Sequence, residues 1–260
     1  IDLSDPEKSI EKLNESYFTE LEVKDLSFRS SAFHLPIDDI DISAKMDGHA
    51  ATIKNFHVKT GDSEIFIRAS ISDLPAILHH TGDPVTAILD IKSPLIDIHA
   101  LTSGDTVKKK PVDEQVRDLS MKLKFNSSAR AFTESPNLPV GEFFIEDLYA
   151  QLNHYPHTLH DFHADVFIDD QDFRVVDFTG MIDSSDFHFT GKLNNYDLWF
   201  LNEPLGDTKV EFNLNSTLLQ LEDVFAYQGE NFVPEDYRHE EFRKLTIHGV
   251  ADLHFNKGLQ

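Results

Sequence analysis

Four histidines spaced three residues apart are the side chains of this sequence best suited by type and spacing to chemistry. They are His154, His157, His160 and His163. On a helix, histidines at i and i+3 share a face, and their ring nitrogens can share a metal ion such as Zn²⁺. Pro156 disfavours a helix here, and on a regular strand residues 160 and 163 point to opposite faces. The sequence therefore predicts solvent-exposed strand and turn histidines and no metal ligands, with a metal site as the alternative.

Paired carboxylates are the second candidate for chemistry, because general acid–base catalysis needs two carboxyl groups in unlike surroundings. Adjacent acidic pairs stand at 38–39, 169–170 and 240–241. With 46 Asp and Glu residues such pairs arise by chance, and these lie in expected turns. The sequence also lacks an Asp-x-Asp-x-Asp-Gly calcium loop, a Gly-x-Ser-x-Gly turn and a glycine-rich phosphate loop. We expect no catalytic residues, no cofactor and no enzymatic activity.

Composition limits the class of protein. The chain has 260 residues, of which 40% are hydrophobic, enough to bury a core. Its formal net charge of −23 repels phosphate backbones, so nucleic acid is not an expected partner. It has no cysteine, which excludes disulfides, thiolate ligands and a cysteine nucleophile. The simplest interpretation of the charge is a soluble, self-repelling surface rather than an acidic binding face.

The elements that must position these residues are β-strands. Apolar and polar residues alternate over many short segments, a pattern typical of strands with one dry face and one wet face. Short polar turns, such as those at 47–48 and 60–62, favour antiparallel hairpins. The alternation predicts strands at 21–28, 38–46, 51–58, 64–71, 85–92, 119–125, 143–152, 161–168, 173–180, 186–193, 209–216 and 245–255.

Helix is expected to be scarce. Segments 73–80 and 196–201 could each form one or two helical turns that plug an end of the sheet, and 1–18 has helical spacing in places. Long polar links are expected at 102–118 and 225–244. Links that recur at one point of the pattern suggest a chain that crosses back before it starts the next sheet unit.

The strand pattern occurs twice. Segment 21–74 aligns with 143–196 without a gap, and after one inserted residue 87–95 aligns with 210–218. Identities are few, so the prediction of a duplication depends on the phase of the apolar positions. We expect one continuous domain over 1–260, and a piece of a longer protein because both ends look cut. Its parts would be repeat one at 21–101, a linker at 102–118, repeat two at 119–224, a link at 225–244 and the start of a further repeat at 245–260.

The apolar side of these strands needs cover, because a sheet with one apolar face is not stable in water. A second sheet would cover it in a compact sandwich. Alternatively, the sheet curls along its length into a gutter with its many Phe and Ile side chains inside, and a ligand covers them. Acyl chains would suit such a gutter, at about 0.8 kcal/mol per buried methylene. From composition and periodicity alone, the sandwich ranks ahead of the gutter.

Two degenerate motifs recur in a fixed order. One is a tight turn followed by an amphipathic strand that runs into a short plug, at 62–74 and 184–196. The other is a strand followed by Ser-x-Leu-Leu/Ile-x-Leu/Ile, at 93–98 and 216–221. Their order and recurrence, over about 20–255, resemble the AsmA-like family of bacterial envelope proteins, part of the repeating β-groove or bridge-like lipid-transfer proteins.

This resemblance implies units of about five antiparallel strands plus a crossover, stacked into a long, taco-shaped sheet. It implies a hydrophobic groove that holds or conducts phospholipid and a role in outer-membrane lipid homeostasis. It also implies a periplasmic body and an N-terminal inner-membrane anchor, which we expect in the parent protein outside this piece. The family offers no catalytic residues. With the resemblance, the groove ranks ahead of the sandwich.

The sequence therefore predicts an all-β fold: an elongated, strongly curved antiparallel sheet of two stacked multi-strand repeats with short helical plugs. The expected function is non-catalytic binding of phospholipid acyl chains on the concave face. The residues expected on that face are Ile40, Ile42, Met46, Ile65, Ile67, Ile71, Leu89, Ile91, Phe162, Val166, Phe187, Phe189, Leu193, Phe212 and Leu214. The alternative is a surface or secreted β-repeat module for adhesion or glycan binding. It would use the aromatic residues Tyr155, Trp199, Tyr227 and Tyr237.

Overall fold

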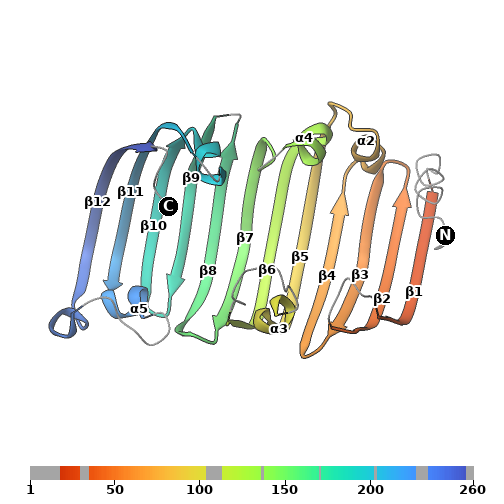
Figure 1. The fold of residues 1–260 in the computed structure, drawn as a ribbon, viewed down its shortest axis with the longest axis horizontal. Coiled ribbons are helices and arrows are strands. Elements are labelled where there is room, and N and C mark those ends of the chain that lie inside the picture. The colour runs from red at the N-terminus through yellow and green to blue at the C-terminus, as the bar shows by residue number, and fades with distance from the viewer. Residues whose placement is uncertain are drawn as a thin grey trace. The chain divides into compact units, whose positions relative to one another are not determined.

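The computed structural model describes residues 18–29, 35–103, 113–135, 138–169, 171–201, 204–226 and 234–255. Within them, 12 antiparallel strands form one sheet in the order of the sequence, and the sheet is not closed (Figure 1). The strands are β1 (Phe18–Phe28), β2 (Ile37–Asp47), β3 (Ala50–Thr60), β4 (Ser63–Ile71), β5 (Pro84–Asp97), β6 (Gln115–Ser128), β7 (Gly141–Leu152), β8 (Tyr155–Ile168), β9 (Asp172–Ile182), β10 (Ser185–Asn194), β11 (Gly206–Gln220) and β12 (Glu241–Phe255). The prediction of an all-β, antiparallel fold is confirmed.

The helices of the described residues are short. They are α2 (Leu74–Leu78), α3 (Ile98–Thr102), α4 (Ala129–Glu134), η1 (Tyr196–Phe200), α5 (Leu221–Phe225) and η3 (Glu235–Tyr237). Helical turns form at both segments predicted as plugs, as α2 and η1. Within the described part of the chain, no helix is long and apolar enough to cross a membrane. The helical spacing noted in 1–18 lies almost wholly outside the described residues, and Phe18 opens β1.

Tight hairpin turns set the register of the strands. Gly48 and Gly61 have φ values of +64° and +57°, a left-handed conformation that costs glycine little because it lacks Cβ. Asp183, in the turn between β9 and β10, also has a positive φ of 47°. These turns lie where the sequence predicts antiparallel hairpins, and the predicted strands all lie within observed ones.

β-Bulges interrupt the simple alternation. In β3, Asn55 lies opposite Ser43 but Ile53 lies opposite Ala44, so one residue is inserted. The insertion turns Ile53 and Phe56, which are three residues apart, to the same face. Without the bulge, the second half of β3 would present its polar side chains to the apolar face.

A bulge in β8 corrects one expectation about the histidines. His160 pairs with Met181 and His163 pairs with Thr179, with a register shift between the two pairs. Residues 181 and 179 are two apart on β9 and share a face, so their partners share a face as well. The prediction that residues 160 and 163 point to opposite faces was wrong, because it assumed a regular strand; Asp161, between them, has a φ of 55°.

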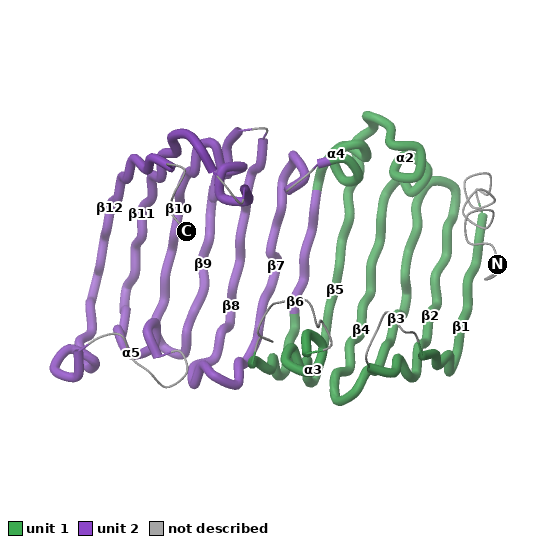
Figure 2. The backbone as a smooth tube through the Cα atoms, viewed as in Figure 1, with its two compact units in different colours: residues 1–120, 126–134 green, residues 121–125, 135–260 purple. Residues whose placement is uncertain are grey.

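The chain divides into two compact units, which Figure 2 colours separately. Unit 1 comprises 1–120 and 126–134, and unit 2 comprises 121–125 and 135–260. In unit 1, α2 and α4 lie side by side at one end of the strands, while α3 lies at the opposite end (Figure 1). Ala76 of α2, Val85 of β5 and Ala129 of α4 form a small buried cluster there.

Unit 2 has its own core. The buried side chains of Ala164, Val166 and Ile168 from β8 pack with Tyr196 of η1. Partly buried residues surround them, including Phe173 of β9 and Leu193 of β10. Thus η1 covers one end of the apolar face of unit 2 by burying its tyrosine.

Among the described residues, four helices and two strand starts fall where the sequence suggested loops or links. Helix α3 follows β5 directly, α5 follows β11 directly, α4 was not anticipated, and η3 lies inside the link predicted at 225–244. β6 begins at Gln115 and β12 begins at Glu241, inside the segments predicted as links. The division into repeats at 21–101 and 119–224 stays a prediction.

Candidate functional site

One face of the unit 1 sheet carries apolar side chains from every strand between β1 and β5. Directly paired residues share a face, so the register defines rows across the sheet. One row is Val23, Ile42, Phe56, Ile67 and Ile91. The next is Leu21, Ala44, Ile53, Ala69 and Leu89, and the third is Thr19, Met46, Ala51, Ile71 and Ala87. The rows form a continuous apolar surface within this unit.

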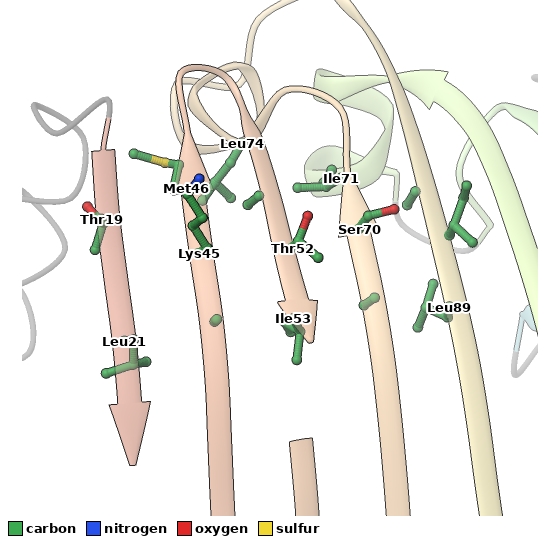
Figure 3. Close-up of a pocket in the computed structure, with 15 residues that line it drawn as sticks. Thr19, Leu21, Lys45, Met46, Thr52, Ile53, Ser70, Ile71, Leu74 and Leu89 are labelled. Carbon is green, nitrogen blue, oxygen red and sulfur yellow. The ribbon is translucent and has the colours of Figure 1, made fainter. Parts of the chain in front are cut away.

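A hollow of about 400 Å³ lies on this face of unit 1. Figure 3 shows its lining side chains on neighbouring strands, with Leu74 of α2 at one end. Four alanines contribute to it, at positions 44, 51, 69 and 87. Each alternates along its row with a larger residue such as Met46, Ile53 or Leu89. The small side chains therefore make the depression, and the large ones form its walls.

Unit 2 has a hollow of its own, of about 650 Å³. All of its lining residues are apolar, and several are aromatic: Phe125, Phe143, Phe173, Phe178, Phe187 and Phe189. The rings of Phe178 and Phe187 lie 5.6 Å apart between centroids, in a tilted arrangement. Such tilted aromatic pairs are favourable beyond the area that they bury.

Gly180 of β9 is needed beneath this aromatic group. A Cβ atom there would lie 2.8 Å from the Phe162 ring and 2.9 Å from the Phe187 ring. Those two rings are also in contact with each other, with centroids 5.4 Å apart. The glycine thus lets two phenylalanines lie flat against the backbone of the sheet.

The structure places the 15 residues predicted for the groove on these two apolar faces. Met46, Ile71 and Leu89 line the hollow of unit 1, and Val166, Phe187, Phe189 and Leu214 line that of unit 2. The other eight do not line either hollow: Ile40, Ile42, Ile65, Ile67, Ile91, Phe162, Leu193 and Phe212. Of the 15, four are buried (Ile40, Met46, Phe162 and Val166) and the rest remain partly exposed, which would be unusual for the core of a sandwich.

Sequence reasoning missed about three quarters of the lining of the two hollows, since only seven of its 29 residues were predicted. It passed over the alanines of unit 1, because alanine gives little apolar signal, and Ile53, because the β3 bulge shifts its phase. In unit 2 it missed Phe173, Val175 and Phe178 on β9. Val175 pairs with Val166 but Phe178 pairs with Ala164, so a bulge shifts the phase there too. A jump from period two to a spacing of three between apolar residues is the signal that would have found them.

The other face of unit 2 carries charged side chains beside two phenylalanines, Phe144 and Phe167. Asp165 of β8 lies directly opposite Asp177 of β9. Partial burial, with the nearby charges of Glu142 and Asp177, raises the pKa of Asp165 above its ordinary value. Charged groups of this kind are absent from the lining of the hollow on the apolar face of unit 2.

His157 differs from the other histidines singled out in the sequence. Its side chain is only 15% exposed, and its Nδ1 lies 2.7 Å from Asp183 Oδ2 and 3.7 Å from Asp223 Oδ1. His160 instead makes contacts to the Asp161 carboxylate and to the main-chain carbonyl of Asp183. The sequence expectation of exposed histidines therefore does not describe His157.

Comparisons of the chain with models of known protein families, with curated proteins and with solved structures find no match. The functional argument accordingly comes from the geometry of the two faces.

Proposed function

We propose that the apolar face of each unit binds the acyl chains of phospholipid, and that the chain acts without catalysis. The observation that carries this proposal is the pair of apolar hollows, one in each unit, on sheet faces whose side chains stay partly exposed. Exposed apolar patches of more than a few hundred Å² on a soluble protein usually mark a binding surface. A flexible hydrocarbon chain is the ligand class that matches two hollows whose linings are mostly or wholly apolar.

Energetics support an acyl chain as the occupant. Each methylene group transferred from water contributes about 0.8 kcal/mol, so eight methylenes contribute roughly 6 kcal/mol before the cost of ordering the chain. In unit 2 the lining offers no hydrogen-bonding side chain, so recognition there would be of the hydrocarbon and not of the head group. Polar head groups would stay at the mouth, in water.

Recurring element bounds support the proposal that the chain is built from two stacked copies. β3 and β9 start at Ala50 and Asp172 and end at Thr60 and Ile182, a separation of 122 residues at both ends. Helix α3 at 98–102 and helix α5 at 221–225 recur in the same way, at 123 residues. In each copy, the hydroxyl of a buried serine accepts a hydrogen bond from the backbone N–H group just before that helix. Ser63 accepts from Asp97 N and Ser185 accepts from Gln220 N, both at 2.9 Å.

On this proposal, the sheet would be elongated and strongly curved, with its concave side apolar. The resemblance to AsmA-like proteins then suggests a periplasmic location, an inner-membrane anchor and a contribution to outer-membrane lipid homeostasis.

The alternative of an adhesion or glycan-binding module gains little from the structure. Glycan binding needs exposed aromatic rings, yet Tyr155 is buried, and Trp199, although half exposed, packs its ring edge-on against Phe255 at 5.7 Å. Tyr237 is exposed, and Tyr227 lies outside the described residues. Of the described aromatic residues expected to carry the alternative, one is thus buried and the ring of another is partly covered.

Native mass spectrometry tests the proposal. The chain would be produced in a Gram-negative periplasm, purified without detergent and measured with lipidomics of any released ligand. We expect co-purifying phospholipid that is reduced in Phe189→Asn, which puts an amide into the hollow of unit 2. Val176→Asn is the matched control, because Val176 is 48% exposed and lies outside that hollow. A lipid-free, folded wild-type chain, or equal loss of lipid in both variants, would contradict the proposal.

A further inference from the structure

We propose that His157, Asp183 and Asp223 form a binding site for a divalent transition-metal ion of the Zn²⁺ class. This site is separate from the apolar hollow of unit 2, and the proposal does not depend on lipid binding. The three residues come from the start of β8, the β9–β10 turn and helix α5. An ion there would join three segments of unit 2 that are far apart in the sequence.

The distances suit a shared ion. One ligand atom from each of the three side chains lies within 4.8 Å of the other two. Zn²⁺ binds imidazole nitrogen and carboxylate oxygen at about 2.0–2.2 Å, so two ligands of one ion lie roughly 3–4 Å apart. A small inward movement of the side chains would bring all three into coordination. Three protein ligands leave a further coordination position for water.

Both carboxylates approach the same ring nitrogen. His157 Nδ1 lies 2.7 Å from Asp183 Oδ2 and 3.7 Å from Asp223 Oδ1. A single N–H group can donate a good hydrogen bond to only one of these carboxylates. The shorter distance shows that Asp183 is the carboxylate that accepts it. Asp223 is 95% buried, and its Oδ1 faces His157 Nδ1 at 3.7 Å, which is longer than a hydrogen bond. A metal ion between the side chains would give Oδ1 a closer partner.

His57 in unit 1 shows how an ordinary cluster of a histidine and two carboxylates differs from the arrangement around His157. Its Nε2 lies 2.9 Å from Glu64 Oε1, and its Nδ1 lies 3.7 Å from Asp41 Oδ2. Each carboxylate there faces its own ring nitrogen. At His157, by contrast, Nε2 is buried without a hydrogen-bond partner among the described residues. Among the described residues, the polar contacts of the His157 ring are therefore made by Nδ1, the nitrogen that faces the two carboxylates.

The surrounding groups hold the carboxylates in position. The fully buried Ser185 hydroxyl donates to Asp223 Oδ2 at 2.6 Å, which leaves Oδ1 directed at the histidine. The backbone N–H of Thr158 donates to Asp183 Oδ1 at 2.8 Å. Both acids therefore have the outer support typical of metal ligands.

The corresponding corner of unit 1 folds without any of these groups. Leu35 and Gly61 stand 122 residues before His157 and Asp183, and Ala100 stands 123 residues before Asp223. The Leu35 side chain reaches the Gly61 position, where a Cβ would lie 3.7 Å from Leu35 Cδ1. The same two positions thus meet in both units, but only unit 2 places metal-ligating side chains there. The His–Asp–Asp set is consequently not required for forming this corner.

Calorimetric titration of the metal-free 260-residue chain with ZnCl₂ tests the site. We expect one Zn²⁺ per chain, with affinity reduced roughly 100-fold or more in His157→Gln and Asp183→Asn, since loss of supporting residues alone commonly costs 10- to 100-fold. His57→Gln is the matched control and should bind Zn²⁺ as the wild type does. Asp183→Asn keeps an acceptor for the Thr158 N–H, so it tests the site even if His157→Gln does not fold.

Cobalt spectroscopy gives a second readout. Co²⁺ bound at three protein ligands and water should give visible absorption bands that disappear in Asp183→Asn and persist in His57→Gln. Zn²⁺ should also raise the melting temperature of the wild type, because an ion that binds only the folded chain stabilises it. No Zn²⁺ binding by the wild type, equal binding by the His157 and Asp183 variants through other histidines, or binding of Ca²⁺ in place of Zn²⁺ would overturn the proposal.

Discussion

The hydroxyl group of Tyr155 donates a hydrogen bond to the main-chain carbonyl of Asp223, 68 residues later in the chain. This contact holds α5 against the start of β8. Burial, together with the charges of Asp223 and Asp183, raises the pKa of Tyr155 to about 12. The tyrosine therefore remains a protonated donor at all physiological pH values, and it fixes the backbone that carries Asp223.

Replacing Tyr155 by Phe should destabilise the chain by about 1–3 kcal/mol, because the buried Asp223 carbonyl loses its donor. Urea unfolding followed by circular dichroism measures this change. Tyr237→Phe is the control: Tyr237 is 57% exposed, and its variant should stay within about 0.5 kcal/mol of the wild type. Equal stability of the two variants would show that the Tyr155 contact contributes little.

Gly180→Ala should also destabilise the chain, by about 1–3 kcal/mol, because the new Cβ would collide with the Phe162 and Phe187 rings. The control is Gly82→Ala, since a Cβ at Gly82 has no heavy atom within 4 Å. Thermal unfolding of both variants checks the prediction. If Gly180→Ala melted like Gly82→Ala, the close packing of the rings on the backbone would be refuted.

Filling the hollow of unit 1 should reduce lipid binding without unfolding the sheet. Ala69→Leu adds a branched side chain to the lining, whereas Arg68→Leu puts the same side chain at the exposed neighbouring position outside the hollow. We expect a lower lipid-to-protein ratio for Ala69→Leu alone, measured by native mass spectrometry, with unchanged strand content by circular dichroism. Similar ratios for the two variants would argue against this hollow as a binding surface.

Acid should destabilise the chain partly through Asp186. Burial alone would raise its pKa, but hydrogen bonds from the backbone N–H groups of Thr217 and Leu218, at 3.0 and 2.7 Å, lower it below the ordinary value. A carboxyl group with a depressed folded-state pKa contributes stability above its unfolded-state pKa. This stability is lost as pH falls through the folded-state pKa.

Asp186→Asn should therefore flatten the acid side of the stability profile. Urea midpoints between neutral pH and about pH 3 measure the slope, which reports the difference in bound protons between the two states. Asp62→Asn, at an exposed turn, corrects for the loss of one negative charge. A slope for Asp186→Asn equal to that of Asp62→Asn would exclude this contribution of Asp186.

The strands were predictable because each alternates apolar and polar residues over most of its length. The short helices were harder, since five or six residues contain little more than one helical turn and show no clear period. Ala129 of α4 is completely buried and Asp97 caps α3 by accepting from Ala100 N at 2.7 Å. The burial of Ala129 depends on neighbours that folding brings together, which local sequence patterns do not reveal. The Asp97 cap, by contrast, is a local contact, and an Asp before a short helix is a start signal that the sequence does contain.

The two candidate sites differ in the same way. Phe187 and Phe189 could be assigned to the apolar face because strand periodicity alone defines that face. His157 was recognised as a possible ligand, but its partners Asp183 and Asp223 lie 26 and 66 residues further on. Their convergence depends on the β9–β10 turn and on α5, and the second of these was not predicted.

Because the strands pair in the order of the sequence, each new strand finds its partner among the residues that come just before it. Contacts close in sequence need little loop closure, so hairpins can form early and the sheet can grow by adding one strand at a time. Hydrogen exchange should accordingly be graded, with the amides of the edge strands β1 and β12 exchanging before those of inner strands such as β9. During synthesis, such a chain can start to fold on its first hairpin well before its last strand has been made.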